Sequence, residues 1–358
     1  MLNFQQADKA AKQFSRFDHQ CTIEAIGHGL IHQTYKISGG NEADAFILQA
    51  INRNVFSKPE DIISNYLKVC DFLSKTDSIV QIPAPRFSNN GQPFWIDEEN
   101  NFWRATSFVP GSYSPLKAEN IQAAEEVADV FAGFTKALAG LDMKLLKEII
   151  PGFHNLEQRW LHFESAINLG PIDRLLKSTH IISEFRSRKA LVNFYESTKA
   201  DKDFPDRVMH HDCKISNILF DKQTHQVICP VDLDTVMPGK FFSDLGDMIR
   251  TMACTEDENS ILWEKISINE PLYKAILRGY LRRTESILTK QEKDHIHLAG
   301  LIMIFMQGIR FLTDYLHGDT YYKIEYPGQN LNRALNQLIL LERLEEFLYR
   351  EYGVTSIA

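Results

Sequence analysis

The sequence predicts an α+β protein with two lobes, a small antiparallel β lobe with one helix and then a larger, mostly helical lobe. Three observations lead to this prediction. Short apolar, β-prone runs separated by turns fill most of the first hundred residues. Pro110-Gly111 then forms a natural hinge. Helical patterns dominate the remainder, so we expect an N-terminal lobe at 1–110 and a C-terminal lobe at 111–358.

The elements of the first lobe follow from local patterns. An amphipathic helix is expected at 4–19, and Pro59 in a first turn opens a second helix at about 58–74. Gly-rich and Asn-rich turns separate the expected strands, which are 21–26, 35–37, 45–51 and, after the second helix, two more that flank the turns at 89–91 and 97–101, the last of them being 102–109. This order describes an antiparallel sheet with one helix across it.

The second lobe is expected to be helical apart from one β-hairpin. The candidate helices are 118–140, 155–168, 178–199, 243–253, 271–288, 291–316 and 331–351. The hairpin is expected at 218–231. Asp244 and Asp247 are expected to cap and anchor the helix that runs from Leu245 onward.

Composition excludes several classes of protein. The 358 residues suffice for two lobes, and a net charge of −8 lacks the basic footprint of a nucleic-acid binder. The longest apolar run, 301–306, is far too short to span a membrane. Five Cys without CxxC spacing, and an N-terminus without a signal pattern, predict reduced thiols in a cytoplasmic protein. We expect a monomer or weak homodimer with no nucleic-acid or membrane partner.

The stretch His210-His211-Asp212-Cys213-Lys214-Ile215-Ser216-Asn217 is the strongest functional signal. Asp232 follows fifteen residues after Asn217, at the end of an apolar run. Two carboxylates and an amide in this spacing are what phosphoryl transfer from Mg-ATP requires, because one group accepts the hydroxyl proton and two hold metal. Asp212 is the candidate base, and Asn217 and Asp232 are the candidate ligands of Mg²⁺.

Hairpin geometry supports this assignment. The apolar runs 218–220 and 227–231 flank a polar turn at 221–225. Folding about residues 224 and 225 sets Asn217 roughly opposite Asp232, where paired residues lie ~5 Å apart at Cα. One cation could then bridge the amide oxygen and the carboxylate, with phosphates and water completing its shell.

The nucleotide signal is weaker. Gly27 and Gly29 sit between two expected strands, where glycine lets backbone N–H groups approach phosphate oxygens. A plain hairpin turn explains them equally well, since the third Gly of GxGxxG is absent and no GxxxxGK[S/T] occurs. Adenine is expected to bond to backbone near Ser107, Phe108 and Val109, just before the hinge.

These residues resemble the aminoglycoside phosphotransferase and choline kinase superfamily, and within it the N-acetylhexosamine 1-kinases. The likeness covers nearly the whole chain. The matching stretches are Phe46-Ile47-Leu48-Gln49, Asn217-Ile218-Leu219, Asp232-Leu233-Asp234-Thr235-Val236-Met237-Pro238-Gly239, Asp244-Leu245-Gly246-Asp247 before Ile249-Arg250, Gly308-Ile309-Arg310-Phe311-Leu312-Thr313-Asp314-Tyr315-Leu316, and Tyr326-Pro327 with Asn330-Leu331. The resemblance implies a protein-kinase-like fold, with ATP and Mg²⁺ as cofactors and nucleotide binding in the N-terminal lobe. It also implies phosphorylation of the anomeric hydroxyl of an N-acetylhexosamine, a role in carbohydrate metabolism.

The resemblance also implies roles for single residues. His210 would brace the catalytic loop. Asp234 would contact sugar or metal, and Arg310 and Tyr321 would lie in the sugar pocket. Arg310 could instead form a structural ion pair with Asp314, four residues on.

Departures from the family pattern leave alternatives open. Gln49 stands where most of the superfamily has an ATP-binding Lys, as it does in the hexosamine kinases. Leu30 stands where the sugar kinase used for comparison has a His, so either His32 substitutes for it or the sugar differs. Residues 115–207 match poorly. The acceptor could therefore be another small alcohol, such as choline, an amino alcohol or an aminoglycoside, or the chain could be an inactive nucleotide-binding member.

Overall fold

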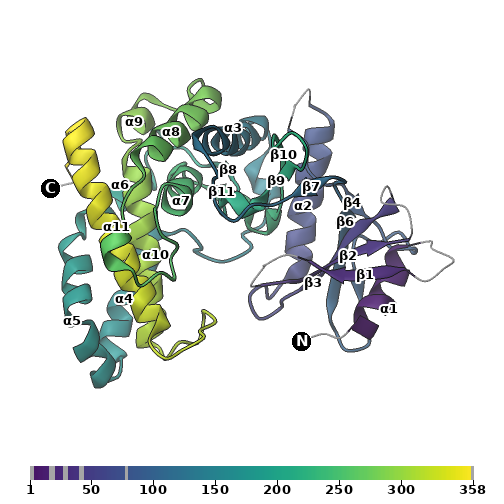
Figure 1. Ribbon diagram of the computed structural model, residues 1–358, viewed down its shortest axis with the longest axis horizontal. Coiled ribbons are helices and arrows are strands. Elements are labelled where there is room, and N and C mark those ends of the chain that lie inside the picture. The colour runs from purple at the N-terminus through teal and green to yellow at the C-terminus, as the bar shows by residue number, and fades with distance from the viewer. Residues whose placement is uncertain (1–3, 16–20, 27–30, 40–43, 77–79, 356–358) are drawn as a thin grey trace. The chain divides into compact units, whose positions relative to one another are not determined.

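A computed structural model describes residues 4–15, 21–26, 31–39, 44–76 and 80–355. The chain forms two compact units (Figure 1). One, the sheet unit, comprises 1–114, 137–150 and 218–237, and the other, the helical unit, comprises 115–136, 151–217 and 238–358. The sheet unit therefore contains the expected N-terminal lobe together with two segments that are distant in sequence.

The main sheet of the sheet unit is antiparallel throughout. Its strands follow the order β1-β2-β3-β6-β4, and β5 also pairs with β6. Their bounds are β1 Thr22–Ala25, β2 Gln33–Ser38, β3 Phe46–Ile51, β4 Pro85–Arg86, β5 Trp95–Ile96 and β6 Phe102–Ser107. The expected antiparallel sheet is confirmed, but three strands follow α2 (Pro59–Ser74) instead of the two expected, because β4 and β5 each pair with β6. The register pairs Gln49 directly with Arg104 on β6, which matters for the site below.

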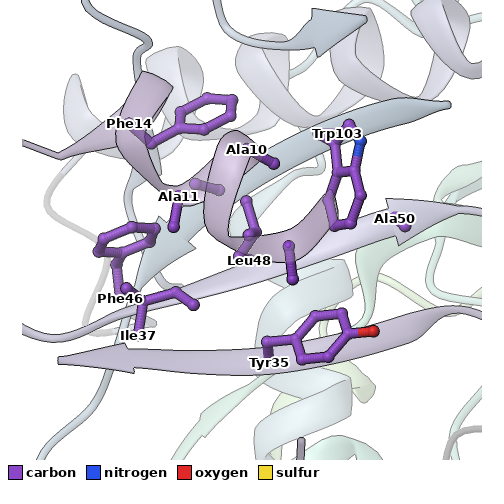
Figure 2. Packing of buried hydrophobic residues seen from close by; sticks show 11 residues of the cluster. Ala10, Ala11, Phe14, Tyr35, Ile37, Phe46, Leu48, Ala50 and Trp103 are labelled. Atoms are coloured by element: carbon purple, nitrogen blue, oxygen red, sulfur yellow. The ribbon is translucent and has the colours of Figure 1, made fainter. Parts of the chain in front are cut away.

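Helix α1 (Phe4–Phe14) covers one face of this sheet (Figure 2). Its small residues let it approach the strands closely, and Phe14 closes one end of the cluster. The cluster comprises Ala7, Ala10, Ala11, Phe14, Tyr35, Ile37, Phe46, Leu48, Ala50, Trp103 and Ala105. All are buried, and burial of about 25 cal/mol per Å² of apolar surface stabilises the strands that carry Gln49 and Arg104.

Helix α2 (Pro59–Ser74) begins as expected, with Pro in its first turn and Glu60 and Asp61 near its positive end. Asn65 on this helix is buried, and its amide donates to the carbonyl oxygens of Lys147 at 2.8 Å and Val236 at 3.0 Å. The amide therefore ties α2 to the segment that follows Asp234.

The expected hairpin is present as β9 (Ile218–Asp221) and β10 (Val227–Pro230). Short strand β7 (Ser112–Tyr113) pairs with the other edge of β9. The register differs from the prediction, because Ile218 pairs with Pro230 and the register shifts between Val227 and Cys229. The cause is a wider turn and a bulge: the Asp221 carboxylate accepts the N–H groups of residues 223 and 224, and His225 adopts a left-handed φ of +57°.

The helical unit is built around α10 (Leu298–Leu316), which packs against α4 (Leu156–Leu169), α7 (Phe242–Met252) and α11 (Gln329–Tyr352) (Figure 1). In the described part of the chain, α10 alone is long and apolar enough to cross a membrane, and 83% of the window that passes this test is buried inside the molecule. The other elements that lie wholly or mostly in this unit are α3 Ile121–Ala137, α5 Ile172–Ser187, α6 Ala190–Thr198, β8 Arg207–Met209, β11 Met237–Gly239, α8 Glu270–Thr284 and α9 Lys290–Asp294.

Two helices expected from sequence are each divided in the structure. The expected helix at 178–199 is the end of α5 and all of α6, separated at Arg188 and Lys189. The guanidinium of Arg188 binds Glu345 at 2.9–3.1 Å and Glu184 at 3.0 Å, which fixes this corner. The expected helix at 291–316 is α9 and α10, separated at residues 295–297.

Candidate active site

The loop after β8 is anchored by one carboxylate of α7. The backbone N–H groups of His210 and His211 donate to the two carboxylate oxygens of Asp244, at 2.9 and 2.8 Å. Asp244 is fully buried. The prediction that it caps a helix from Leu245 is wrong, because α7 already begins at Phe242 and the carboxylate binds the loop instead.

Asp247, the second expected cap, also has another role. Its carboxylate accepts from the guanidinium of Arg250 at 2.9 and 3.1 Å, inside α7. Burial raises the pKa of Asp247, and the nearby charge of Asp212 adds to this, while Arg250 opposes it. Asp247 is thus a buried acid beside the loop rather than a helix cap.

The two histidines of the loop are both buried, in different surroundings. The ring of His210 lies edge-on to Phe131 and Phe134, and its Nδ1 accepts from the N–H of Asp212 at 3.3 Å. His211 has a left-handed φ of +67°, unusual for a residue with a Cβ. Such strain persists only where surrounding contacts fix the backbone, and here Asp244 supplies them.

Asp212 is half-buried, and two donors meet at one oxygen of its carboxylate. Its Oδ2 accepts from Lys214 Nζ and from Asn217 Nδ2, both at 2.8 Å. Burial alone would raise the pKa of Asp212, but the charge and hydrogen bond of Lys214, with His210 and Asn217, outweigh it and lower the pKa. The carboxylate is therefore ionised at neutral pH, the state in which it can accept a proton.

The amide of Asn217 is oriented by Asp212. Its Nδ2 donates to the Asp212 carbonyl oxygen at 2.9 Å and to Oδ2 at 2.8 Å. Both partners are acceptors, so the NH₂ group must face them and the amide oxygen points elsewhere. A hard cation such as Mg²⁺ takes an oxygen of this kind. The residue present here therefore fits the predicted metal role.

Asp232, the other candidate metal ligand, lies in the sheet unit just after β10. It is exposed and adopts a left-handed conformation, with φ +62° and ψ +59°, before the 3₁₀ turn η4 (Leu233–Thr235). In the described part of the chain no three His, Cys, Asp or Glu side chains group to hold a metal. A cation here would thus rely on few protein oxygens, with phosphates and water completing its shell.

Asp234 is buried in a network of the sheet unit. Its Oδ1 lies 2.5 Å from Arg104 NH1, an ion pair without hydrogen-bond geometry, and its Oδ2 lies 2.7 Å from His32 Nε2. His32 Nδ1 accepts from the N–H of Asn52 at 3.1 Å, so Nε2 carries the proton and donates to Asp234. Burial raises the pKa of Asp234, but Arg104 and His32 outweigh it and hold the pKa well below its usual range.

Gln49, at the strand position where the resemblance noted above would place a lysine, is held within the same network. Its Nε2 donates to Thr34 Oγ1 at 3.1 Å, and its Oε1 accepts from Arg104 Nε at 3.0 Å. Arg104 thus bridges Gln49 and Asp234 from the neighbouring strand. It is the buried cation next to the lysine position, and a buried Arg at 104 was not identified from sequence.

The candidate nucleotide contacts are only partly described. Gly27 and Gly29 lie outside the described residues, as does Leu30. Ser107 ends β6, and its N–H already donates to the carbonyl oxygen of Ala84 at 2.8 Å. The carbonyl oxygen of Val109 accepts from Ser112 Oγ at 2.6 Å. Gly111 follows with φ +68°, a turn conformation that glycine adopts readily.

Arg310 and Tyr321 belong to the helical unit. Arg310 NH1 donates to Gln307 Oε1 at 2.9 Å, and its guanidinium lies 5.1 Å from the ring centroid of Phe153. Tyr321 is 56% exposed. The predicted Arg310–Asp314 ion pair is wrong, because the Asp314 carboxylate instead accepts the N–H groups of residues 320, 321 and 322 at 2.8–2.9 Å.

The structure adds residues to the site that sequence reasoning missed. Lys214 contacts the candidate base, Asp244 holds the loop, and Arg104 pairs with Asp234. Of these three roles, only that of Lys214 could have been predicted from the sequence, because Lys214 lies two residues after Asp212 in the same loop. The other two depend on tertiary contacts that no local pattern contains.

Comparison with known sequences gives a family match over most of the chain. The sequence profile of the phosphotransferase enzyme family matches residues 22–287. This span includes both motif regions, 210–217 and 232–234, and Gln49.

Comparison with solved structures gives matches over nearly the whole chain. A microcompartment-associated aminopropanol kinase has a TM-score of 0.65 at 16% identity, covering 95% of this chain and 97% of that one. An aminoglycoside phosphotransferase from Alicyclobacillus acidocaldarius has 0.62 at 14%, covering 98% and 95%. A choline kinase from Cryptosporidium parvum has 0.58 at 14%, covering 98% and 97%. At these identities the likeness concerns the fold, and it confirms the protein-kinase-like fold class.

Proposed function

We propose that this chain, which belongs to the phosphotransferase enzyme family, transfers the γ-phosphoryl group of Mg-ATP to a hydroxyl group of a small sugar, with Asp212 as general base. One observation carries the proposal. Asn217 directs its NH₂ group to Asp212, which keeps the amide oxygen available for a cation beside an ionised carboxylate. Base and metal ligand are thus prepared by a single pair of contacts.

The proposed step is an in-line displacement at phosphorus. The acceptor oxygen forms a bond to the γ-phosphorus, and the bond to the bridging oxygen of the β-phosphate breaks, so that ADP leaves. The acceptor proton passes to the carboxylate of Asp212. Asn217 and Asp232 would hold Mg²⁺, which supplies neutralising charge to the phosphates when bound. Lys214, 2.8 Å from Asp212, would add a positive charge at the reacting centre.

The nucleotide side of the proposal rests on the sheet unit. Gly27 and Gly29 are proposed to lie against phosphates, and the backbone at Ser107 and Val109 against adenine. Gln49 cannot supply the charge of a lysine, and Arg104 beside it is the candidate substitute. Structures of similar fold were solved as a GDP complex of an aminoglycoside 2'-phosphotransferase and an ADP complex of a spectinomycin phosphotransferase, which supports nucleotide binding here.

For the acceptor we propose the anomeric hydroxyl of an N-acetylhexosamine, with Arg310 and Tyr321 in the pocket. His32 is not free to replace the histidine missing at Leu30, because both of its ring nitrogens are engaged. Both carboxylate oxygens of Asp234 are likewise engaged, one by Arg104 and the other by His32. Its proposed contribution to the acceptor site is therefore to orient these two side chains.

A second acceptor class is favoured by the structural comparison. Solved structures of similar fold include an aminopropanol kinase, a choline kinase and an ethanolamine kinase. A screen for ADP release across N-acetylhexosamines, hexoses, aminoglycosides, choline and amino alcohols separates the two classes. ATP binding without ADP release on any of them would instead identify an inactive nucleotide-binding member.

The central test is the Asp212→Asn variant. Turnover should fall by orders of magnitude, because the proton acceptor is lost, while ATP binding survives with Asn217 and Asp232 intact. Asp221→Asn, in the exposed hairpin turn, is the matched control and should keep its activity. Near-normal turnover in Asp212→Asn would remove Asp212 from the base role.

A further inference from the structure

Arg159 and Arg310 of the helical unit both contact Phe153, and neither arginine has an acidic partner. Arg159 on α4 donates through Nε and NH2 to the carbonyl oxygen of Phe153, at 3.2 and 3.1 Å. Arg310 on α10 places its guanidinium 5.1 Å from the Phe153 ring and 5.7 Å from the Tyr322 ring. Among the described residues, neither arginine forms a salt bridge.

Three other arginines of the helical unit are paired with an acid, Arg188 with Glu345 at 2.9 Å, Arg207 with Glu292 at 2.5 Å and Arg250 with Asp247 at 2.9 Å. Buried Arg333 on α11 has no acidic partner either, but its guanidinium donates to three acceptors, Asn259 Oδ1, Asn330 Oδ1 and the Lys323 carbonyl oxygen, at 2.8–3.2 Å. Glu258, whose charge acts on Tyr322, is already bound to Arg250 at 2.8 Å. The charges of Arg159 and Arg310 therefore stand without compensation.

The two charges repel each other at a half-buried position. Burial lowers the pKa of Arg159, and the charge of Arg310 lowers it further, to about 10. Burial also lowers the pKa of neighbouring His154, and the charges of His211, Arg310 and Arg159 add to that effect. The repulsion between the two guanidinium groups costs stability in the folded protein. A position that keeps such a cost is a candidate functional position, because a ligand of opposite charge would relieve the repulsion.

Contacts connect this pair to the loop of Asp212. His211 Nδ1 lies 2.6 Å from Ser243 Oγ, which in turn lies 2.5 Å from His154 Nδ1. The ring of His154 stacks on Phe153 at 4.3 Å between centroids. The rings of Tyr321 and Tyr322 meet at 4.8 Å, and the Tyr322 ring lies 5.7 Å from the guanidinium of Arg310. Every one of these residues belongs to the helical unit, so the chain of contacts lies within one compact body.

We propose that Arg159 and Arg310 form a subsite for an oxyanion carried by the acceptor, a carboxylate, sulfate or phosphate group on the sugar. Guanidinium groups bind such groups with paired hydrogen bonds, and the Tyr321 face suits the apolar surface of a sugar ring. The subsite disfavours cationic acceptors such as choline or amino alcohols. It rests on the proposed function, which it narrows from neutral sugars to acidic ones.

The kinetic test compares matched acceptors in the full chain. N-acetylglucosamine is compared with its 6-sulfate and 6-phosphate, and glucose with glucuronate, with choline as the cationic arm. A higher kcat/KM for the anionic member of each pair supports the subsite. The anionic acceptor with the largest increase in kcat/KM identifies the oxyanion. Equal use of the neutral and anionic members would overturn it.

Variants then assign the subsite to the two arginines. Arg159→Gln and Arg310→Gln should each lower kcat/KM for the anionic acceptor roughly ten- to hundredfold, the value of one charge-assisted hydrogen bond, mainly through KM. Arg310→Lys should recover part of the loss. Arg343→Gln, on the exposed face of α11, is the control. An equal loss of kcat on neutral and anionic acceptors would instead assign the arginines to the transferred phosphoryl group.

A second measurement does not need turnover. Sulfate or inorganic phosphate, titrated without nucleotide, should raise the Tm of the wild-type chain and not that of Arg159→Gln. The variant without ligand should be at least as stable as wild type, because removing one charge ends the repulsion. An anion effect that is the same in both proteins would contradict the subsite even if ATP turnover were found. Absence of turnover on all acceptors would reject the kinase proposal alone.

Discussion

Lys214 is the residue that sets the charge state of Asp212, because its ammonium lies 2.8 Å from the carboxylate. The pKa of Asp212 is lowered in the folded protein despite burial. A lowered pKa keeps the carboxylate ionised as pH falls through the range in which free Asp, with a pKa of about 3.9, would protonate. The acid limit of activity should therefore not reflect Asp212 in the wild-type chain.

Replacing Lys214 should expose this titration. In Lys214→Met, burial acts on Asp212 with less opposition, so its pKa rises and activity is lost at a higher pH on the acid side. The measurement is the pH profile of kcat/KM. Lys222→Met, in the exposed hairpin turn, should leave the profile unchanged. An acid limb that stays in place in Lys214→Met would show that Lys214 does not control the base.

Arg104 and Asp234 form a buried ion pair, so replacing one partner leaves the charge of the other unpaired. Arg104→Met should lower the free energy of unfolding by about 3–5 kcal/mol, as measured by urea unfolding at pH 7. Asp234→Asn added to that variant should restore part of the loss, since no buried charge then remains. The exposed pair Arg343–Glu346 is the control and should change stability by about 0–1 kcal/mol.

The pair's contribution to the free energy of unfolding depends on pH, because the pKa of Asp234 is lowered in the folded protein. A carboxylate with a depressed folded-state pKa stabilises the protein above its unfolded pKa of about 3.9 and loses this contribution as pH falls towards the folded value. The difference in stability between wild type and the double variant should therefore shrink below about pH 4. A difference that grows on acidification would contradict the assignment.

At the scale of elements, α7 and β11 together fix the conformation of the loop. Asp244 of α7 holds two of its N–H groups, and Gly239 of β11 lies against the ring of His211. A Cβ at position 239 would lie 2.4 Å from His211 Cε1, so the ring or the strand must move. The loop thus depends on a glycine that sequence reasoning placed only in a matching stretch.

Gly239→Ala should therefore lower kcat clearly, with only a small loss in thermal stability. Gly279→Ala on α8 provides the contrast, because its Cβ would lie 2.1 Å from the backbone oxygen of Glu125 on α3, whereas that helix contacts the loop further along, through Phe131 and Phe134. That overpacking should cost about 1–3 kcal/mol of stability, with kcat per folded molecule unchanged. Thermal unfolding and steady-state kinetics on both variants separate the effects. Equal kcat in Gly239→Ala and wild type would argue against the contact with His211.

At the scale of the whole molecule, the sequence predicted what local periodicity and spacing control. The antiparallel sheet, the start of α2 at Pro59 and the hairpin after residue 217 were predicted correctly. Errors arose where tertiary contacts decide. The Arg188–Glu345 pair fixes the break between α5 and α6, and a bulge shifted the hairpin register. The partners of Asp244 and Arg104 lie far away along the chain, so no local sequence pattern predicts the roles of these two residues.

Metal and nucleotide binding should stabilise the folded chain as a whole. A ligand present at 100 times its Kd, binding only the folded state, adds about 2.7 kcal/mol. A non-hydrolysable ATP analogue with Mg²⁺ should therefore raise Tm by a few °C, and EDTA should reverse the Mg²⁺-dependent part. Asn217→Ala should lose that part while keeping the response to nucleotide alone, because its amide oxygen contacts only the metal in the proposed site. If Asn217→Ala kept the full Mg²⁺ response, the cation would have to be held by other oxygens of the chain, and Asp232 would be the next residue to replace.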